Sequence, residues 1–277
     1  MFIYKQWDEF CKKLYNEGFI SQTASDLKKN NSDKPFLVLK HDVETNPSKA
    51  LKLAQIENKY SHKGSYYVQA YLLKRKKHIK TLKKIQELGH EVSYHHDVMD
   101  GNKGDIVKAK AEFQRNVDIF QGNGFAIETV CQHGNPVIER NGYYSNRDFF
   151  RDNEVAELYH NIDEIMVNFR SRINHNYKYI SDAGYGWKII FDPENNDRIK
   201  SSEKDVPLDN LDKVMKIIRT QNSVIISTHP HRWNSSKLNA KFKNIIFKNI
   251  KFTAKIMLKM PLMKKIMGRF YYLAKKI

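Results

Sequence analysis

Histidine and carboxylate side chains recur directly after several short apolar segments of this sequence. They form five groups: His41, Asp42 and Glu44; His95, His96 and Asp97; His133; Asp182; and His229 with His231. Imidazole and carboxylate groups bind Zn²⁺ and related divalent ions, and they also transfer protons near neutral pH. The five groups therefore indicate a site that binds a metal ion and moves protons.

The segments before these groups have the composition of β-strands, because they are short and rich in β-branched and aromatic residues. The predicted strands are 36–40, 64–68, 91–94, 127–132, 177–181 and 223–228. Helical patterns alternate with them at 47–60, with Asn46 as the cap, at 78–88 and at 105–120. This alternation predicts an α/β fold with a mostly parallel sheet, whose strands all end on one face. The five groups should meet there.

Catalytic zinc sites usually keep three protein ligands and leave one position open. Glu44, His95 and His133 supply that number from three different strand ends. The remaining groups suit acid–base work, with a carboxylate near the reacting water and a histidine on the opposite side. An isolated histidine after a strand is more often a capping or solvated residue, so the prediction depends on the five groups occurring together.

Five motifs carry a resemblance to a known family. They are HDVE at 41–44, GHEVSYHH at 89–96, QHGNP at 132–136, SDAGYGW at 181–187 and THPHRW at 228–233. In this order and spacing the sequence resembles the polysaccharide deacetylase family, also called NodB-homology or carbohydrate esterase 4-like proteins. The resemblance covers roughly residues 36–233. It implies an irregular, TIM-like (β/α)7 barrel and metal-dependent hydrolysis of an acetyl group on a sugar.

Carried over to this sequence, the resemblance assigns the general base to Asp42 and the metal-binding carboxylate to Glu44. It assigns the first histidine of the family's H-x-x-x-H motif to His95. Met99 stands where the motif has its second histidine, and its thioether cannot replace a nitrogen ligand of such a cation. The family's catalytic arginine motif is also absent around residues 132–136. Both departures predict a divergent branch of the family.

The third metal ligand must then come from elsewhere. The candidates are His133, His96 and Asp97, in that order of preference. His133 comes from another strand end, whereas His96 should point opposite to His95 if one strand runs through both. The metal is expected to be Zn²⁺, with Co²⁺ or Ni²⁺ as alternatives.

The remaining motif residues receive roles in the same hypothesis. His229 is predicted to protonate the leaving group, and Asp182 to orient His229. Trp187, Trp233 and Asn135 are candidate substrate-binding residues, although the two tryptophans suit core packing equally well.

Positive charge is concentrated at the C-terminal end. The chain of 277 residues has 48 Lys and Arg against 31 Asp and Glu, a net charge of +17. Sixteen of the basic residues and none of the acidic ones lie from Lys213 onward, so residues 1–212 carry 32 basic and 31 acidic residues. A near-neutral body without a recognised nucleic-acid motif makes nucleic acid an unlikely partner.

We divide the chain into a leading helix and lead-in at 1–35, the deacetylase-like barrel at 36–234 and basic amphipathic helices at 235–277. In the last segment Lys248, Lys251, Lys255 and Lys259 alternate with Ile, Phe and Met. Such helices bind anionic membrane surfaces. The alternative, given equal weight, is a helix that packs on the barrel with its lysines in solvent.

Two cysteines exclude a disulfide framework, and neither a secretory signal nor an apolar stretch long enough to cross a membrane is found. We therefore expect a cytoplasmic protein, peripheral at the inner face of the membrane. The predicted function is removal of an N- or O-acetyl group from a sugar of a bacterial surface polysaccharide or its lipid-linked precursor. The alternatives are a deformylase acting on a lipid-linked amino sugar, and a catalytically inactive NodB-like binding module at the membrane.

Overall fold

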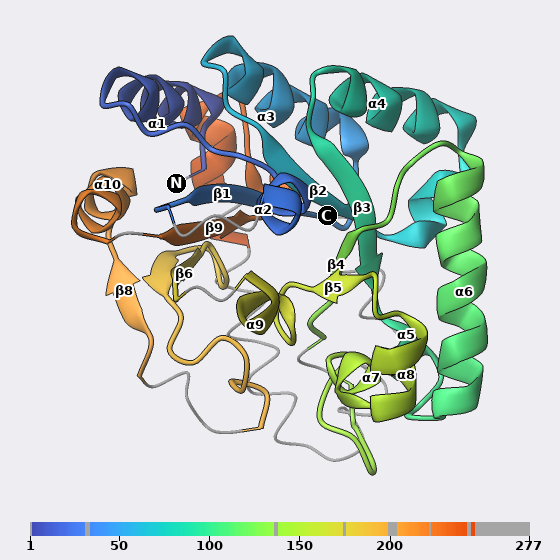
Figure 1. Cartoon of the computed structure of the whole chain (residues 1–277). Helices are drawn as coiled ribbons and strands as arrows, with labels where there is room; N and C mark the ends of the chain where they lie inside the picture. Colours follow the sequence, from blue (N-terminus) through green and yellow to red (C-terminus); the bar gives the residue numbers. More distant parts are fainter. Residues whose placement is uncertain are drawn as a thin grey trace.

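A computed structural model describes residues 2–30, 34–135, 138–173, 176–198, 204–221, 223–242 and 245–246. Within these ranges, strands and helices alternate around a nine-stranded sheet (Figure 1). The strands are β1 (Leu37–Val43), β2 (Gly64–Val68), β3 (Glu91–His96), β4 (Thr129–Gln132), β5 (Asp163–Glu164), β6 (Lys178–Ser181), β7 (Trp187–Ile189), β8 (Val206–Leu208) and β9 (Val224–Thr228). Their order in the sheet is β5-β4-β3-β2-β1-β9-β6-β7-β8.

The sheet is mostly parallel, as the sequence predicts. Strands β5, β4, β3, β2, β1, β9 and β6 pair in parallel, and only the β6–β7 and β7–β8 pairings among the described strands are antiparallel. No pairing between described strands joins β5 to β8. The α/β class is therefore confirmed, whereas closure into a (β/α)7 barrel stays a prediction.

The six predicted strands correspond to β1, β2, β3, β4, β6 and β9. Sequence patterns miss β5, β7 and β8, which have only two or three residues each and are too short to show a strand period. Strand β8 lies at the end of the polar segment 192–209.

Helices cover the outer face of the sheet. They are α1 (Tyr4–Asn16), α3 (Pro47–Lys59), α4 (Lys76–Glu87), α6 (Ile106–Gly122) and α10 (Leu211–Thr220). In Figure 1, α1, α3 and α4 form one row, and contacts join α1 to α3 and α3 to α4. Helices α2 (Ala24–Asn30) and α9 (Phe169–Ile173) contact each other and contribute to the apolar cluster on the inner face.

Short helices complete the connections: η1 (Ala70–Lys74), α5 (Val98–Gly101), α7 (Asp148–Arg151), α8 (Asn153–Leu158) and η3 (Pro230–Arg232). Asn46 precedes α3 and Pro47 is its first residue, as predicted. The side chain of Asn46 makes no capping hydrogen bond, however, and its backbone is left-handed with φ 45°. The tight turn after β1 thus replaces the expected side-chain cap.

Strand β1 is buried along its whole length, and its side chains alternate between two cores. Leu39 packs in the outer cluster with residues of α1 and α10, and Val38 packs in the inner cluster. Because side chains on a strand alternate in direction, Lys40 and Asp42 share the inner face with Val38, and His41 shares the outer face with Leu39. This alternation separates two buried polar clusters by one layer of backbone.

The outer polar cluster is centred on Glu57 of α3, which is fully buried. Its carboxylate accepts hydrogen bonds from Trp7 Nε1 at 2.9 Å and from the Tyr66 hydroxyl at 2.7 Å, and His41 Nε2 lies 2.8 Å from Oε1. Burial alone would raise the pKa of Glu57, but His41, His90 and the Tyr66 hydroxyl hold it below its usual range. The cluster therefore ties α1, α3, β1 and β2 together.

The predicted C-terminal segment is described only in part. Leu238, Phe242 and Ile245 are exposed. Lys248, Lys251, Lys255 and Lys259 lie outside the described residues, so their predicted membrane contact and the three-part division of the chain stay predictions. No helix in the described part is both long enough and apolar enough to cross a bilayer.

Replacing Glu57 by Gln tests the outer cluster. Trp7 Nε1 and the Tyr66 hydroxyl donate to different oxygens of Glu57, whereas a neutral amide has one acceptor oxygen and cannot accept from both. We expect a loss of about 1–3 kcal/mol in the free energy of unfolding. Chemical denaturation followed by tryptophan fluorescence measures it.

Glu87→Gln, an exposed change on α4, is the matched control and should leave stability unchanged. Because the pKa of Glu57 is lowered on folding, its ionised form contributes stability above the ordinary carboxyl pKa of about 4.3. That contribution is lost as the pH falls through the folded-state value, so the difference between wild type and Glu57→Gln should shrink in acid. A Glu57→Gln protein as stable as wild type at pH 7 would show that the cluster does not stabilise the fold.

Candidate active site

The predicted site residues come from the carboxyl ends of five parallel strands. Asp42 is in β1 and Glu44 follows it, His95 is in β3, His133 follows β4, Asp182 follows β6 and His229 follows β9. Parallel strands end at the same edge of a sheet, so the five ends open on one face. The structure brings these side chains together.

Glu44, His95 and His133 form a candidate metal centre. One ligand atom from each lies within 4.8 Å of the other two, and His133 Nε2 is 3.3 Å from Glu44 Oε1. Tetrahedral zinc with bonds of about 2.0–2.1 Å has ligand atoms roughly 3.3–3.4 Å apart. The donor set of one carboxylate and two imidazoles fits a catalytic zinc ion.

His95 presents a defined nitrogen to this centre. Its Nδ1 lies 3.0 Å from the carbonyl oxygen of Cys131, which can only accept, so Nδ1 carries the proton and Nε2 keeps its lone pair. Burial lowers the pKa of His95 to about 3. The ring is therefore neutral near pH 7, which metal binding requires.

A second group of possible ligands overlaps the first: Asp42, His95 and Cys131. Burial raises the pKa of the Cys131 thiol well above its usual value, and the thiolate is the form that binds metals. Asp42 is already paired with a lysine. We therefore favour the centre formed with Glu44 and His133.

Asp42 is held by a buried lysine on its own strand. Lys40 Nζ donates to Asp42 Oδ1 at 2.5 Å and to Ser227 Oγ at 3.3 Å, and Ser227 Oγ donates to Asp42 Oδ2 at 3.4 Å. Burial alone would raise the pKa of Asp42, but the Lys40 ammonium and nearby His95 and His229 lower it to about 2. The carboxylate is thus ionised and fixed in orientation.

His229 is oriented by Asp182. The Nδ1 of His229 lies 2.6 Å from Asp182 Oδ1, and its backbone N–H donates to Oδ2 at 3.0 Å. Arg232 Nη1 donates to Oδ1 at 2.7 Å, and the Thr228 hydroxyl donates to Oδ2 at 2.6 Å. Burial would raise the pKa of Asp182, but Arg232 and His229 hold it well below its usual range. Asp182 is therefore a fixed anion behind the imidazole.

The free nitrogen of His229 faces the candidate metal centre. Its Nε2 is 3.9 Å from Asp42 Oδ2 and 3.9 Å from Glu44 Oε1. The Asp42 carboxylate and the His229 imidazole thus border the same small space. Lys40 fixes the orientation of Asp42, and Asp182 fixes that of His229.

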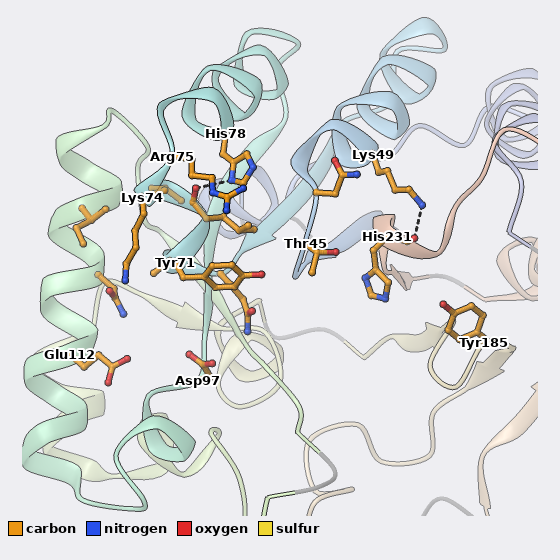
Figure 2. A pocket seen from close by; sticks show the side chains of 17 residues that line it. Thr45, Lys49, Tyr71, Lys74, Arg75, His78, Asp97, Glu112, Tyr185 and His231 are labelled. Carbon is orange, nitrogen blue, oxygen red and sulfur yellow. Dashed lines mark hydrogen bonds between the residues drawn. The ribbon is translucent and has the colours of Figure 1, made fainter. Parts of the chain in front are cut away.

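The other candidate ligands lie elsewhere. His96 is surrounded by the rings of Phe113, Phe149 and Phe150, and neither ring nitrogen has a hydrogen-bond partner among the described residues. It therefore occupies the face of β3 opposite to His95. Asp97 lines a cavity beside the centre (Figure 2).

Met99, which replaces the family's second histidine, is buried in α5 and packs in the outer core. Its position supplies no ligand to the centre. The ligand count is reached instead through His133, whose backbone N–H donates to the His96 carbonyl at 2.7 Å and so extends the β3–β4 pairing.

The structure corrects the assignment of both tryptophans, Trp187 and Trp233, to substrate binding. Trp233 is fully buried, with its ring 5.1 Å from that of Trp7, and Trp187 is 6 % exposed in the same core cluster. Neither ring is available to stack on a sugar. Asn135 is also buried, and its carbonyl accepts from Arg140. The exposed aromatic residue beside the centre is Tyr71, whose hydroxyl donates to the Glu44 carbonyl at 2.5 Å.

A polar network that sequence patterns miss holds the loop after β4. Asn146 Nδ2 donates to the His133 carbonyl at 2.7 Å and to Asp100 Oδ2 at 2.9 Å. Arg140 binds both oxygens of Asp100 at 2.8 Å. These residues fix the backbone that carries His133, and no local motif marks them because they meet only in the fold.

Metal binding separates His133 from His96 as the third ligand. His133→Ala removes a ligand and should weaken zinc affinity by more than about 100-fold, since even second-shell changes cost 10–100-fold. His96→Phe places an aromatic ring among aromatic rings and should leave zinc affinity unchanged. Competition with a chromogenic chelator measures both. Loss of zinc in His96→Phe but not in His133→Ala would reverse the assignment.

No protein-family model and no curated protein matches this chain. Among solved structures, its fold is similar to that of a CE4 esterase from Streptococcus mutans, with 12 % sequence identity and a TM-score of 0.47. The likeness covers 86 % of this chain and 90 % of that one. At this identity and TM-score the neighbour is a distant one.

Proposed function

We propose that this protein is a metal-dependent hydrolase that removes an N- or O-acetyl group from a sugar of a surface polysaccharide or its lipid-linked precursor. One observation carries the proposal: Asp42 and His229 border the space beside Glu44, and each is held by its own buried partner. Hydrolysis of an amide or ester needs one group to accept a proton and another to donate one.

A zinc ion held by Glu44, His95 and His133 would supply Lewis acidity, which polarises a carbonyl and lowers the pKa of water. Asp42 is ionised, as a proton acceptor must be, and its contact with Lys40 keeps one oxygen in a fixed direction. Asp42 would take the proton of the attacking water.

His229 would complete the reaction. Its Nδ1 is fixed by Asp182, so Nε2 is the nitrogen that exchanges a proton with the substrate. The bond between the acetyl carbon and the sugar nitrogen or oxygen breaks, and His229 Nε2 protonates the leaving amine or alkoxide. Water is consumed, and acetate and the free amino or hydroxyl group are the products. The proton that Asp42 took from water returns to His229 Nε2, which lies 3.9 Å from Asp42 Oδ2, and both residues regain their starting states.

Asp42→Asn and His229→Ala test these roles. Each should lower kcat for acetate release from N-acetylglucosamine oligosaccharides by about 10²–10⁴-fold, because each removes a general acid–base group. Zinc affinity should stay that of the wild type. Asp212→Asn, on the exposed start of α10, is the control and should retain full activity.

Two results would contradict the roles. Asp42→Asn with wild-type turnover would remove Asp42 as the base, and loss of zinc in Asp42→Asn would favour the overlapping group with Cys131. Formate release from N-formyl sugars without acetate release from acetylated ones would support the deformylase alternative.

We also propose that the enzyme binds an anionic membrane surface, where a lipid-linked substrate would be found. The concentration of basic residues after Asp212 supports it. Each Lys near such a surface contributes about 1 kcal/mol. Replacing Lys248, Lys251, Lys255 and Lys259 by Glu in the full chain should therefore weaken co-sedimentation with phosphatidylglycerol vesicles by more than about 100-fold.

Vesicles of neutral phosphatidylcholine are the control and should bind wild type and variant equally weakly. If the four changes leave binding to anionic vesicles unaltered, the lysines do not attach the protein to membranes, and the alternative of a tail packed on the barrel is favoured.

A further inference from the structure

Four consecutive cations lie beside the candidate metal centre. Lys74, Arg75, Lys76 and Lys77, which we call the basic cluster, run from the end of η1 into the start of α4, and all four are exposed. None of them forms an ion pair within the described part of the chain. From Lys74 to Lys84 the sequence has seven basic residues and no acidic one. The near-neutral total of residues 1–212 therefore includes a strongly positive local region.

The position of the basic cluster does not stabilise α4. The first turn of this helix contains no acidic residue, and no side chain caps its start. Cations in a first turn are unfavourable beside the positive end of the helix dipole, and Lys76 and Lys80 are like charges four residues apart on one face. These charges cost helix stability, and a bound anion would offset that cost.

The geometry of η1 directs Lys74 toward the centre. In a 3₁₀ helix, side chains three residues apart lie on the same side, so Lys74 shares the side of Tyr71. The Tyr71 hydroxyl donates to the Glu44 carbonyl at 2.5 Å. With a rise of about 2 Å per residue, the backbone of Lys74 lies about 6 Å beyond that of Tyr71 along η1. Lys74 therefore faces the same space as Tyr71, a short distance from the ligand Glu44.

A cavity of about 1210 Å³ joins the basic cluster to the centre (Figure 2). Lys74 and Arg75 line it, and so do Tyr71 and Thr45, the residue that directly follows Glu44. Small-molecule sites occupy about 300–1,000 Å³, so the cavity has room for a sugar together with a charged group attached to it.

The acidic residues of the lining do not neutralise these two cations. They are Asp97 and Glu112, and in Figure 2 both lie below Arg75 and the amine of Lys74. Glu112 Oε2 accepts a hydrogen bond from Asn102 Nδ2 at 2.6 Å. Among the described residues, neither Lys74 nor Arg75 is joined to a carboxylate by an ion pair. Both cations of the lining are therefore available to an anion.

We propose that the basic cluster binds a phosphate or diphosphate group on the anomeric carbon of the sugar whose acetyl group is hydrolysed. Phosphate oxygens accept charge-assisted hydrogen bonds from Lys and Arg, and the Arg fork can bind two oxygens at once. A sugar ring between the centre and Lys74 would bring its anomeric phosphate to the cluster. The substrate class is then a glycosyl phosphate or diphosphate, a precursor of the polysaccharide. The proposal deepens the proposed function and rests on it.

Binding, measured separately from hydrolysis, tests this proposal. The probes are UDP-N-acetylglucosamine, N-acetylglucosamine joined through diphosphate to a farnesyl chain, and the neutral methyl N-acetylglucosaminide. Calorimetry is done on the zinc-loaded full chain carrying Asp42→Asn, so that the probes are not consumed. Both phosphorylated probes should bind at least about tenfold more tightly than the methyl glycoside, because a hydrogen bond to a charged group contributes about that factor or more. Added NaCl should reduce this advantage. The tighter of the two phosphorylated probes identifies the carrier as nucleotide or lipid.

Lys74→Gln combined with Arg75→Gln removes two charges at exposed positions, so the fold should be kept. This double variant should lose the advantage of the phosphorylated probes and bind the methyl glycoside as the parent protein does. Direct binding of diphosphate to zinc would persist in the double variant, which separates it from binding to the cluster. Lys213→Gln combined with Lys216→Gln, at exposed positions of α10, is the matched control and should keep the full advantage.

Two outcomes would overturn the proposal: equal affinity of the parent protein for phosphorylated and neutral probes, or an advantage that persists in the double variant. Acetate release by the chain with native Asp42 is assayed in parallel on UDP-N-acetylglucosamine and on N-acetylglucosamine oligosaccharides. Binding that depends on the cluster without acetate release from either would uphold the phosphate site and refute the hydrolase. Acetate release with a KM for UDP-N-acetylglucosamine that is unchanged in the double variant would do the reverse.

Discussion

Strand β1 is buried on both faces, and the two-residue repeat of its side chains decides where the polar groups of this protein lie. Lys40 and Asp42 point to the inner face and His41 to the outer one. A shift of one residue in its pairing would exchange the two faces and bury the wrong groups in each core. The parallel pairing of β1 with β2 and β9 fixes that register, and with it the direction of Asp42.

Each polar cluster depends on charges that are paired inside the protein. On the inner face, Lys40 neutralises Asp42 and keeps the pKa of this carboxyl near 2. On the outer face, Trp7, Tyr66 and His41 surround Glu57. Buried charges without partners would cost several kcal/mol each, so both pairings are conditions for folding as well as for chemistry. The network of Asp100, Asn146 and Arg140 does the same for the loop that carries His133.

Sequence patterns predict which side chains the ends of the longer strands bring together. The longer strands show their composition, and the parallel arrangement then brings Asp42, His95, His133 and His229 to one edge. Strand alternation also places His96 away from His95.

The role of Lys40 as the buried partner of Asp42 cannot be recognised from the sequence, because a lysine at the end of an apolar segment usually marks the solvent-exposed end of a strand. Trp187 and Trp233 stand in site motifs, which suggests a role in binding, but Phe2 packs against both rings and Trp7 of α1 packs against Trp233. That packing appears only in the fold.

The central claim is that one carboxylate and two imidazoles, from Glu44, His95 and His133, form the metal site. X-ray absorption at the zinc K-edge of the zinc-loaded protein tests it most directly, because nitrogen and oxygen ligands lie at about 2.0–2.2 Å and sulfur at about 2.3 Å. We predict a shell of nitrogen and oxygen with the multiple-scattering signal of two imidazoles. A sulfur ligand, which would come from Cys131, or a shell with a single imidazole would contradict it.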